Sequence, residues 1–369
     1  MCIALLTTAH PRYAIIIIDN RDEFILRPTS QLHWWTTKPE PYLNGSQDES
    51  SNGSSAPQEV HVLSSRDLQR PERGTWLGIS KGGNFAVLTN YRETDTHDAA
   101  HPVHAKRSRG GMVTAWLAAD PRESTRQFVH RMLDEGGVKG VGGFSLICGK
   151  LRRRREEAGE EGKKGEKNIE PLAIISNRVD HPDAVPWICG TRGEVHGLSN
   201  AIYVAPGEEG DEPMWPKIRQ GIDMLRNVAA KESATEEELV EDLFRILDVD
   251  NFPADHTMDL EEGLIHLKDS IFIPAFGEAT HQKEFRDAQA RGKAMEAVPP
   301  AEDSQPNGFQ TGLYGTQRQT IILVDWDGNV RYTERDLWDA NGNPIPRGEG
   351  DKTFYFKIEG WDEALELRN

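Results

Sequence analysis

The chain has 369 residues, 37% of them hydrophobic, which is enough to bury a core in one large domain or two ordinary ones. Its 60 acidic and 43 basic residues give a formal net charge of -17, which argues against the basic surface that nucleic-acid binding requires. No apolar run approaches the roughly 18 residues that cross a bilayer, and no secretory signal opens the chain. The three cysteines form no CxxC pair, so we expect no disulfide framework, no metal site and a reducing, cytoplasmic compartment.

The chain begins with two β-rich runs, Cys2 to Thr8 and Tyr13 to Asp19, joined by a turn at Pro11. Within the second run, residues 14–18 are apolar without alternation, a pattern typical of a strand buried on both faces. A second hairpin is predicted from Gly74 to Asn90. We therefore expect the fold to open in a sheet.

Composition shifts interrupt this pattern at three places, where we expect flexible insertions near 44–70, 151–168 and 250–310. The second contains Arg152 to Lys167, which reads as a solvated hairpin extension, with a nuclear localisation signal as the alternative.

Apolar residues at helical spacing and strand-like runs alternate through the middle of the chain. The predicted helices are Met112 to Ala119, Ser124 to Leu133, Trp215 to Ala230 and Thr235 to Leu247; the predicted strands are Phe144 to Cys148 and Leu172 to Ser176. A third hairpin joins 320–325 to 330–334 through an Asp-Gly turn, and a last strand covers 354–358. Hairpins with helix pairs between them predict an α+β fold, which we assign to one domain over 1–369. Nucleotide-binding glycine motifs are absent from the sequence.

Cys2 is the first candidate for chemistry. Removal of Met1 would give one residue both a thiol and a free α-amine, whose ordinary pKa values are about 8.5 and 7.9. The amine can accept the thiol proton, the thiolate can attack a carbonyl, and the ammonium can protonate the leaving group. Such a site also needs a charged pair that positions the nucleophile and amide donors for the oxyanion.

Four further residues stand where such partners would be needed. Arg21 and Asp22 end the strand that pairs with the strand of Cys2, and Asn90 and Asn200 each close an apolar strand. The pattern alone fits two interpretations. Cys2 also suits a small core position, the charged pair also suits a buried ion pair, and the asparagines also suit strand ends.

Several motifs in register resemble one family. They are Met1-Cys2-Ile3, Asn20-Arg21-Asp22-Glu23-Phe24 with Arg27-Pro28, Gly74-Thr75-Trp76-Leu77-Gly78-Ile79, Leu88-Thr89-Asn90-Tyr91, Gly197-Leu198-Ser199-Asn200-Ala201 and Thr320-Ile321-Ile322-Leu323-Val324-Asp325. From Met1 to about Ile358 the chain is similar to the transport and Golgi organisation protein 2 family of the NRDE-motif superfamily.

The resemblance implies a four-layer αββα sandwich of antiparallel sheets, similar to N-terminal nucleophile hydrolases. By similarity to the cysteine members that hydrolyse bile salts and penicillin V, it implies Cys2 as nucleophile and base and Arg21 with Asp22 as the positioning pair. Asn90 and Asn200 would contact the oxyanion and the substrate. It also implies roles in Golgi organisation, secretion, and haem or acyl-coenzyme A and lipid metabolism, with Golgi or mitochondrial association.

Two details depart from those hydrolases. Arg21 and Asp22 are adjacent, so on a strand they point to opposite faces, and we expect only one of them to reach Cys2. In Gly315-Thr316-Gln317-Arg318 the arginine is displaced by one position from the family's Gly-Thr-Arg, and a bulge is needed to restore the direction of its side chain. Arg318 is therefore a candidate ligand-binding residue.

The alternative function is a non-catalytic carrier of haem or an acyl ligand on a hydrolase scaffold. Haem is a possible cargo rather than a required cofactor, and Trp34-Trp35 is the candidate stacking platform, with core packing as the competing role. His101 and His104 are three residues apart in a polar loop, and among twelve histidines such a pair is more often chance than a ligand set. A third hypothesis is an interaction protein of the secretory pathway that uses the acidic surface and the insertions.

Overall fold

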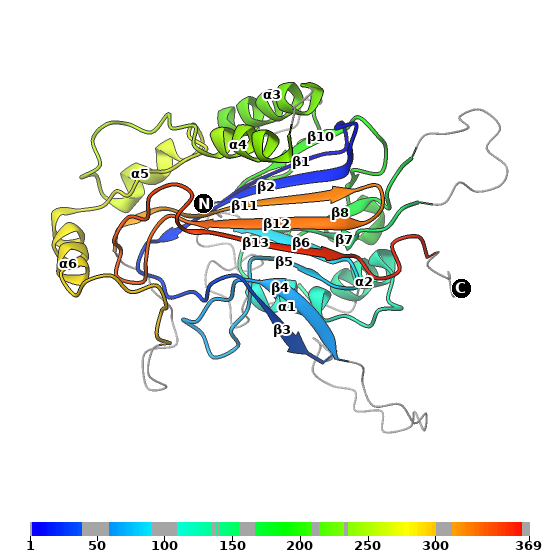
Figure 1. Cartoon of the computed structure of the whole chain (residues 1–369), viewed down its shortest axis with the longest axis horizontal. Helices are drawn as coiled ribbons and strands as arrows, with labels where there is room; N and C mark the ends of the chain where they lie inside the picture. The colour runs from blue at the N-terminus through cyan, green and yellow to red at the C-terminus, as the bar shows by residue number, and fades with distance from the viewer. Residues whose placement is uncertain are drawn as a thin grey trace.

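The computed structural model describes residues 2–38, 59–90, 109–134, 137–138, 141–154, 167–207, 214–231, 235–299 and 312–363. Within these ranges two antiparallel sheets face each other, and helices cover their outer faces (Figure 1). The order of layers is helix, sheet, sheet, helix, so the expected α+β four-layer sandwich is confirmed.

The first sheet has six strands in the order β10-β1-β2-β11-β12-β13. Their bounds are β1 Ile3–Thr7, β2 Tyr13–Phe24, β10 Val195–Leu198, β11 Tyr314–Asp325, β12 Asn329–Asp336 and β13 Asp351–Lys357. β2 and β11 form its centre, and the apolar run at 14–18 is buried on both faces, as its lack of alternation predicted. β2 also continues through the polar residues 19–23 to Phe24.

The second sheet has seven strands in chain order from β3 to β9. Their bounds are β3 His33–Thr37, β4 Val60–Ser64, β5 Leu77–Ser80, β6 Asn84–Asn90, β7 Phe144–Lys150, β8 Leu172–Ser176 and β9 Trp187–Ile188. All of its pairings are antiparallel, including that of β6 with β7, which are separated in the chain by two helices.

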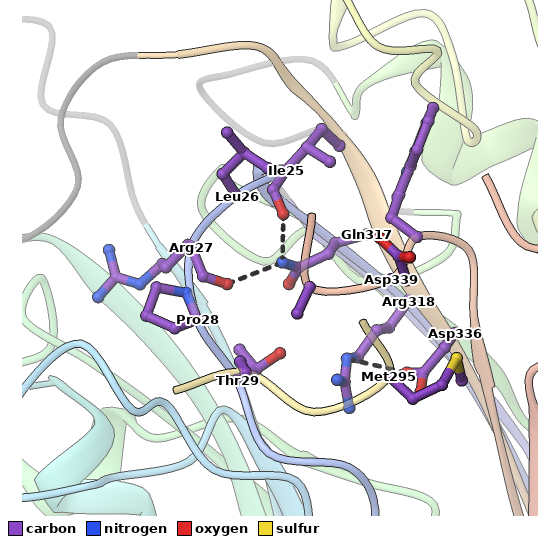
Figure 2. A pocket seen from close by; sticks show the side chains of 13 residues that line it. Ile25, Leu26, Arg27, Pro28, Thr29, Met295, Gln317, Arg318, Asp336 and Asp339 are labelled. Carbon is purple, nitrogen blue, oxygen red and sulfur yellow. Dashed lines mark hydrogen bonds and ion pairs between the residues drawn. The ribbon is translucent and has the colours of Figure 1, made fainter. Parts of the chain in front are cut away.

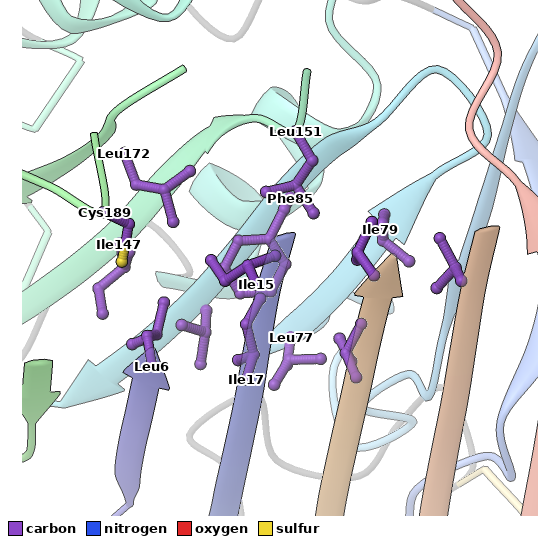
Figure 3. Close-up of a cluster of buried hydrophobic side chains, with 14 of the residues drawn as sticks. Leu6, Ile15, Ile17, Leu77, Ile79, Phe85, Ile147, Leu151, Leu172 and Cys189 are labelled. Atoms are coloured by element: carbon purple, nitrogen blue, oxygen red, sulfur yellow. The ribbon is translucent and has the colours of Figure 1, made fainter. Parts of the chain in front are cut away.

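A core between the sheets holds them together. Ile15 and Ile17 of β2 pack in this cluster with Leu77 and Ile79 of β5 and Phe85 of β6 (Figure 3). From Ile15 onward, the odd-numbered residues of β2 therefore face the other sheet, and the even-numbered residues face the helices.

The helices form the two outer layers. α1 (Arg109–Leu117) and α2 (Thr125–Leu133) cover the seven-stranded sheet, and α3 (Pro216–Ala230) and α4 (Glu236–Leu247) cover the six-stranded sheet. A 3-10 turn, Pro182–Ala184, precedes β9. The N-terminus of α2 is closed by the capping box of Ser124 and Gln127, and that of α4 by the capping box of Thr235 and Glu238. All four helices match the helices predicted from periodicity.

The expected insertions need correction at two places. β4 lies inside 44–70, and its Val60, Val62 and Leu63 are buried, because the polar composition ends at Gln58 and an apolar pattern follows. α5 (Leu260–His266) and α6 (Ala279–Gln289) lie inside 250–310, where short helices carry few apolar residues to reveal them. The other parts of the three predicted insertions, 44–58, 155–166 and 300–310, lie outside the described residues.

Candidate active site at Cys2

Cys2 lies one residue before β1, at the end of the six-stranded sheet where this strand begins; we call this end of the sheet the Cys2 edge. The register pairs Ile3 with Asn20, and the next position along places Cys2 beside Arg21. Ala4 and Leu6 face the other sheet, so Cys2, with the same parity, faces it as well. The side chain is only 7% exposed. Burial, together with Asp19 and Asp22, raises the pKa of the Cys2 thiol to about 12, so the thiol is neutral at physiological pH.

Arg21 shares the inter-sheet face with Cys2. Its guanidinium stacks on the ring of Trp76, with Cζ 4.2 Å from the ring centroid, and its Nη1 donates to Gln317 Oε1. Burial lowers the pKa of Arg21, while the negative charges of Glu23 and Asp67 oppose that effect.

Asp22 points the other way, toward the helices. Its Oδ1 accepts a hydrogen bond from Thr316 Oγ1 at 2.7 Å, and burial raises the pKa of its carboxyl. The side chains of Arg21 and Asp22 therefore point to opposite faces of β2, as expected for neighbouring residues of a strand. Asp22 still touches the nucleophile through its backbone N–H, which donates to the thiol of Cys2.

The two asparagines come together beside Cys2. Asn200 Nδ2 donates to the backbone carbonyl of Asn90, which ends β6. Ser199 Oγ donates to the carbonyl of Cys2 at 2.7 Å, and Thr89 Oγ1 donates to the carbonyl of Ser199 at 2.8 Å. These bonds join the strand ends of both sheets around the cysteine.

Asp19 is a site residue that sequence reasoning missed. It lies on the inter-sheet face of β2, opposite Ala4, and neither carboxylate oxygen has a hydrogen-bond partner among the described residues. Burial raises the pKa of Asp19 well above its usual value, and Asp22 adds to the effect. Alternation along the strand places Asp19 on the same face as Ile15 and Ile17, and this pattern in the sequence could have revealed it.

Trp76 and Arg109 also belong to this region and were not singled out. Gly74 permits the approach of α1, because a Cβ on Gly74 would lie 2.8 Å from the backbone carbon of Gly110. Arg109 begins that helix, donates to the carbonyl of Gly143 at 3.2 Å, and interacts electrostatically with Glu23 and Cys2.

Arg318 reaches the same inter-sheet face because of a bulge. β11 pairs Thr316 with Asp22 and Arg318 with Arg21, and Gln317 is the extra residue between them. The bulge that the displaced arginine required is therefore present. Arg318 is buried and binds Glu334 at 2.6 Å and Asp336 at 3.1 Å.

A small cavity adjoins Arg318. Gln317, Asp336 and residues 25–29 line it, and Gln317 Nε2 donates across it to the carbonyls of Ile25 and Arg27 (Figure 2). Its volume of ≈ 20 Å³, as the described residues form it, holds about one water molecule rather than a substrate.

The tryptophan pair does not form a common platform. Trp34 packs edge-on against Phe356 in the core between the sheets, whereas Trp35 packs under α1 and α2 and donates from Nε1 to Ser64 Oγ at 2.9 Å. Their rings lie on opposite faces of β3, so one flat ligand does not contact both. His101 and His104 are outside the described residues.

One group of side chains has the donor types of a metal site. Cys189, Glu194 and His196 place their ligand atoms within 4.8 Å of one another, at the end of β10 away from Cys2. Glu194 Oε2 already accepts from the backbone N–H of Cys189 at 2.6 Å and lies 2.7 Å from His196 Nε2. These hydrogen bonds close the loop from 189 to 194, and this structural role explains why the three side chains lie together.

No helix in the described ranges is long and apolar enough to span a membrane.

Comparisons with known proteins give one family. Residues 1–339 match the family described as Transport and Golgi organisation 2. The human Transport and Golgi organization protein 2 homolog is 26% identical over 331 residues, which cover 89% of this chain and 88% of the human protein. The bovine homolog is 28% identical over 328 residues, 88% of this chain and 87% of the bovine protein.

Among solved structures, a variant of the conjugated bile acid hydrolase from Clostridium perfringens aligns with a TM-score of 0.37 and 9% sequence identity. The alignment covers 99% of this chain and 100% of the hydrolase chain.

Proposed function

The chain belongs to the Transport and Golgi organisation 2 family, and we propose that it is an N-terminal cysteine hydrolase that cleaves amide or thioester bonds through Cys2. The hydrogen bonds of Ser199 support this proposal most directly. They hold the carbonyl of Cys2 next to Asn200, so a nucleophile and an amide donor from distant parts of the sequence share one buried edge.

The reaction begins once Met1 has been removed. The α-amine of Cys2 takes the proton of the thiol, and Sγ attacks the carbonyl carbon of the substrate. The C–N or C–S bond to the leaving group then breaks, and the leaving group takes the proton from the ammonium. Water attacks the resulting acyl-thioester, the C–S bond breaks, and the products are a carboxylic acid and a free amine or thiol.

The neighbouring residues have separate roles in this proposal. Asn200 uses one N–H of its amide on Asn90, and its second N–H serves the oxyanion. Arg21, fixed against Trp76, supplies positive charge on the face of the thiol. Asp22 holds the sulfur through its backbone N–H. We assign its carboxylate the role of attracting the α-ammonium that removal of Met1 leaves on Cys2.

Intact-mass analysis of the protein from a host that processes N-termini, with fragmentation of the first peptide, tests the first step. We expect a chain that starts at Cys2. Retention of Met1 keeps the α-amine in a peptide bond and excludes this mechanism, which leaves the carrier of haem or an acyl ligand as the alternative.

Acyl-enzyme trapping tests the second step. The processed protein is mixed with p-nitrophenyl acetate or acetyl-coenzyme A, quenched in acid and mapped by mass spectrometry. We expect one acetyl group on Cys2, none after Cys2→Ala, and unchanged labelling after Cys148→Ala, which removes a buried thiol of β7. Labelling that survives Cys2→Ala, or that falls on Cys148 or Cys189, contradicts the proposal.

We place the cellular role in transport and Golgi organisation, following the names of the relatives. Secretion of a reporter protein in cells that carry only the Cys2→Ala chain tests whether this role depends on the hydrolase. We expect secretion to fall to the level of cells without the protein.

A further inference from the structure

Lys217 is a lysine with no exposed surface. It is the second residue of α3, and its side chain has 0% relative exposure. Lysines are almost never fully buried unless they are paired, because removing an ammonium from water has a large free-energy cost. A lysine in this position therefore needs a physical reason.

Local structure supplies one weak contact, because Nζ of Lys217 lies 5.9 Å from the centroid of the Trp215 ring, at the outer limit of a cation–π interaction. Nζ of Lys217 has no hydrogen-bond partner among the described residues. The positive end of the α3 dipole also disfavours a cation in the first turn. Lys150, which is also fully buried, differs in this respect, because its Nζ donates to the carbonyls of Pro121 at 2.6 Å and Glu123 at 2.9 Å.

The charges that face Lys217 belong to the candidate site. α3 packs on the helix side of β1 and β10, with Ile218 and Ile222 against Ile3 and Leu5. Asp22 points toward this same layer from β2. Burial lowers the pKa of Lys217, and Asp22 and Cys2 are the two groups whose negative charge opposes that effect.

We propose that Lys217 is a positioning residue for Cys2, whose ammonium fixes a positive charge behind β2 and stabilises both the Asp22 carboxylate and the Cys2 thiolate. The role of Lys217 in catalysis rests on the proposed function, in which Cys2 is the nucleophile. Arg21 and Lys217 then place positive charge on both faces of the strand that supports the nucleophile. A carboxylate and a thiolate in a site of low dielectric both gain from such a charge.

Site-resolved alkylation measures this effect without a substrate. Iodoacetamide is added to the folded protein between pH 7 and 9, and modification of Cys2 is followed by peptide mass spectrometry. Cys148 and Cys189 are fully buried and report any loss of folding. Lys217→Met should slow the alkylation of Cys2 about tenfold at each pH, as expected for a thiol pKa raised by about one unit. Lys217→Arg should keep most of the wild-type rate, and Lys150→Met should leave it unchanged.

A structural role alone gives a different result. If Lys217→Met lowers the melting temperature but Cys2 reacts at the wild-type rate, the proposal is wrong. If Lys217→Met does not fold, the double variant Asp22→Asn, Lys217→Met decides, because removal of both charges leaves no uncompensated anion. The double variant should then fold, and its failure to fold overturns the proposal. Slowed alkylation in a protein that never forms an acyl-enzyme contradicts the proposed hydrolase but supports the Lys217 charge effect.

Discussion

Asp19 is a carboxylate that the fold buries on the inter-sheet face of β2 without a hydrogen-bond partner among the described residues. Its isosteric replacement by Asn removes the charge and keeps the volume. Because burial raises the pKa of Asp19 well above its usual value, the folded protein favours the protonated carboxyl. The associated stability is present below about pH 4 and is lost as the pH rises through the folded pKa.

We therefore predict that Asp19→Asn stabilises the protein relative to wild type by an amount that grows above about pH 4 and reaches about 1–3 kcal/mol at pH 7. Urea unfolding of both proteins at pH 4, 5.5 and 7 measures the difference. Asp327→Asn, in an exposed turn, is the control and should show no such trend. A pH-independent difference for Asp19→Asn would contradict burial of the charge.

Trp76 is the aromatic residue that holds the arginines of the site. Its ring lies 4.2 Å from Cζ of Arg21 and 6.0 Å from Cζ of Arg318, and it packs in the core between the sheets. We predict that Trp76→Ala lowers the free energy of unfolding by about 3–5 kcal/mol. Trp76→Phe keeps an aromatic face and should be clearly less destabilising. Chemical denaturation measures both, and equal losses would show that volume alone matters at this position.

At the scale of single residues, the sequence singled out some of the residues that form the candidate site and missed others because of how those others are buried. Cys2, Arg21, Asp22, Asn90 and Asn200 stood at strand ends or in motifs, and the structure gathers them near one edge. Asp19 and Lys217 were hidden because their importance comes from burial without a partner, which depends on packing between distant segments. No local pattern marks Lys217 beyond its place at the start of a helix.

Among the elements, β11 shows how a strand absorbs an extra residue. Gln317 is the bulge residue, and the pairs on either side, Thr316 with Asp22 and Arg318 with Arg21, are those of a strand without it. Deletion of Gln317 therefore leaves the register and the direction of Arg318 unchanged. Deletion of Thr320, which is regularly paired with Asp19, would shift one side of the strand by a residue and turn its side chains to the opposite face.

We predict that the Gln317 deletion folds and loses about 2–5 kcal/mol, mainly from the two hydrogen bonds that Gln317 Nε2 donates and the one that its Oε1 accepts from Arg21. The Thr320 deletion should give no cooperative unfolding transition. Circular dichroism and thermal melting of the two variants, with Gln317→Ala beside them, test this. If both deletions fail equally, Gln317 is part of the required register rather than a bulge.

The elements that the sequence predicted are those with strong periodicity. α1 to α4 and the three hairpins carry apolar residues at a clear spacing of helices or strands. α5, α6 and β3 were missed because they are short and only partly buried, so tertiary contacts rather than pattern determine them. The bulge could be predicted because Arg318 needed a defined face, which is a geometric rather than a compositional signal.

At the scale of the whole molecule, the Cys2 edge is a place where hydrogen bonds connect the two sheets. Here Thr89 of β6 donates to the carbonyl of Ser199, next to β10. Ser65, which follows β4, makes a second such connection to Arg318 and Glu334, and an apolar cluster fills much of the remaining space between the sheets. Thr89 has no exposed surface, and Val has nearly the same shape without the hydroxyl. Thr89→Val therefore weakens one inter-sheet bond without emptying space.

We predict that Thr89→Val costs about 1–3 kcal/mol, because the carbonyl of Ser199 loses a buried donor. The strand ends around Cys2 then separate more often, and alkylation of Cys2 should become about fivefold faster or more. Thr333→Val is the matched control, since Thr333 Oγ1 bonds Thr353 Oγ1 at 2.9 Å within one sheet. It should lose similar stability without exposing Cys2. Equal alkylation rates in the two variants would mean that global unfolding, rather than separation of the sheets at this edge, controls access to the nucleophile.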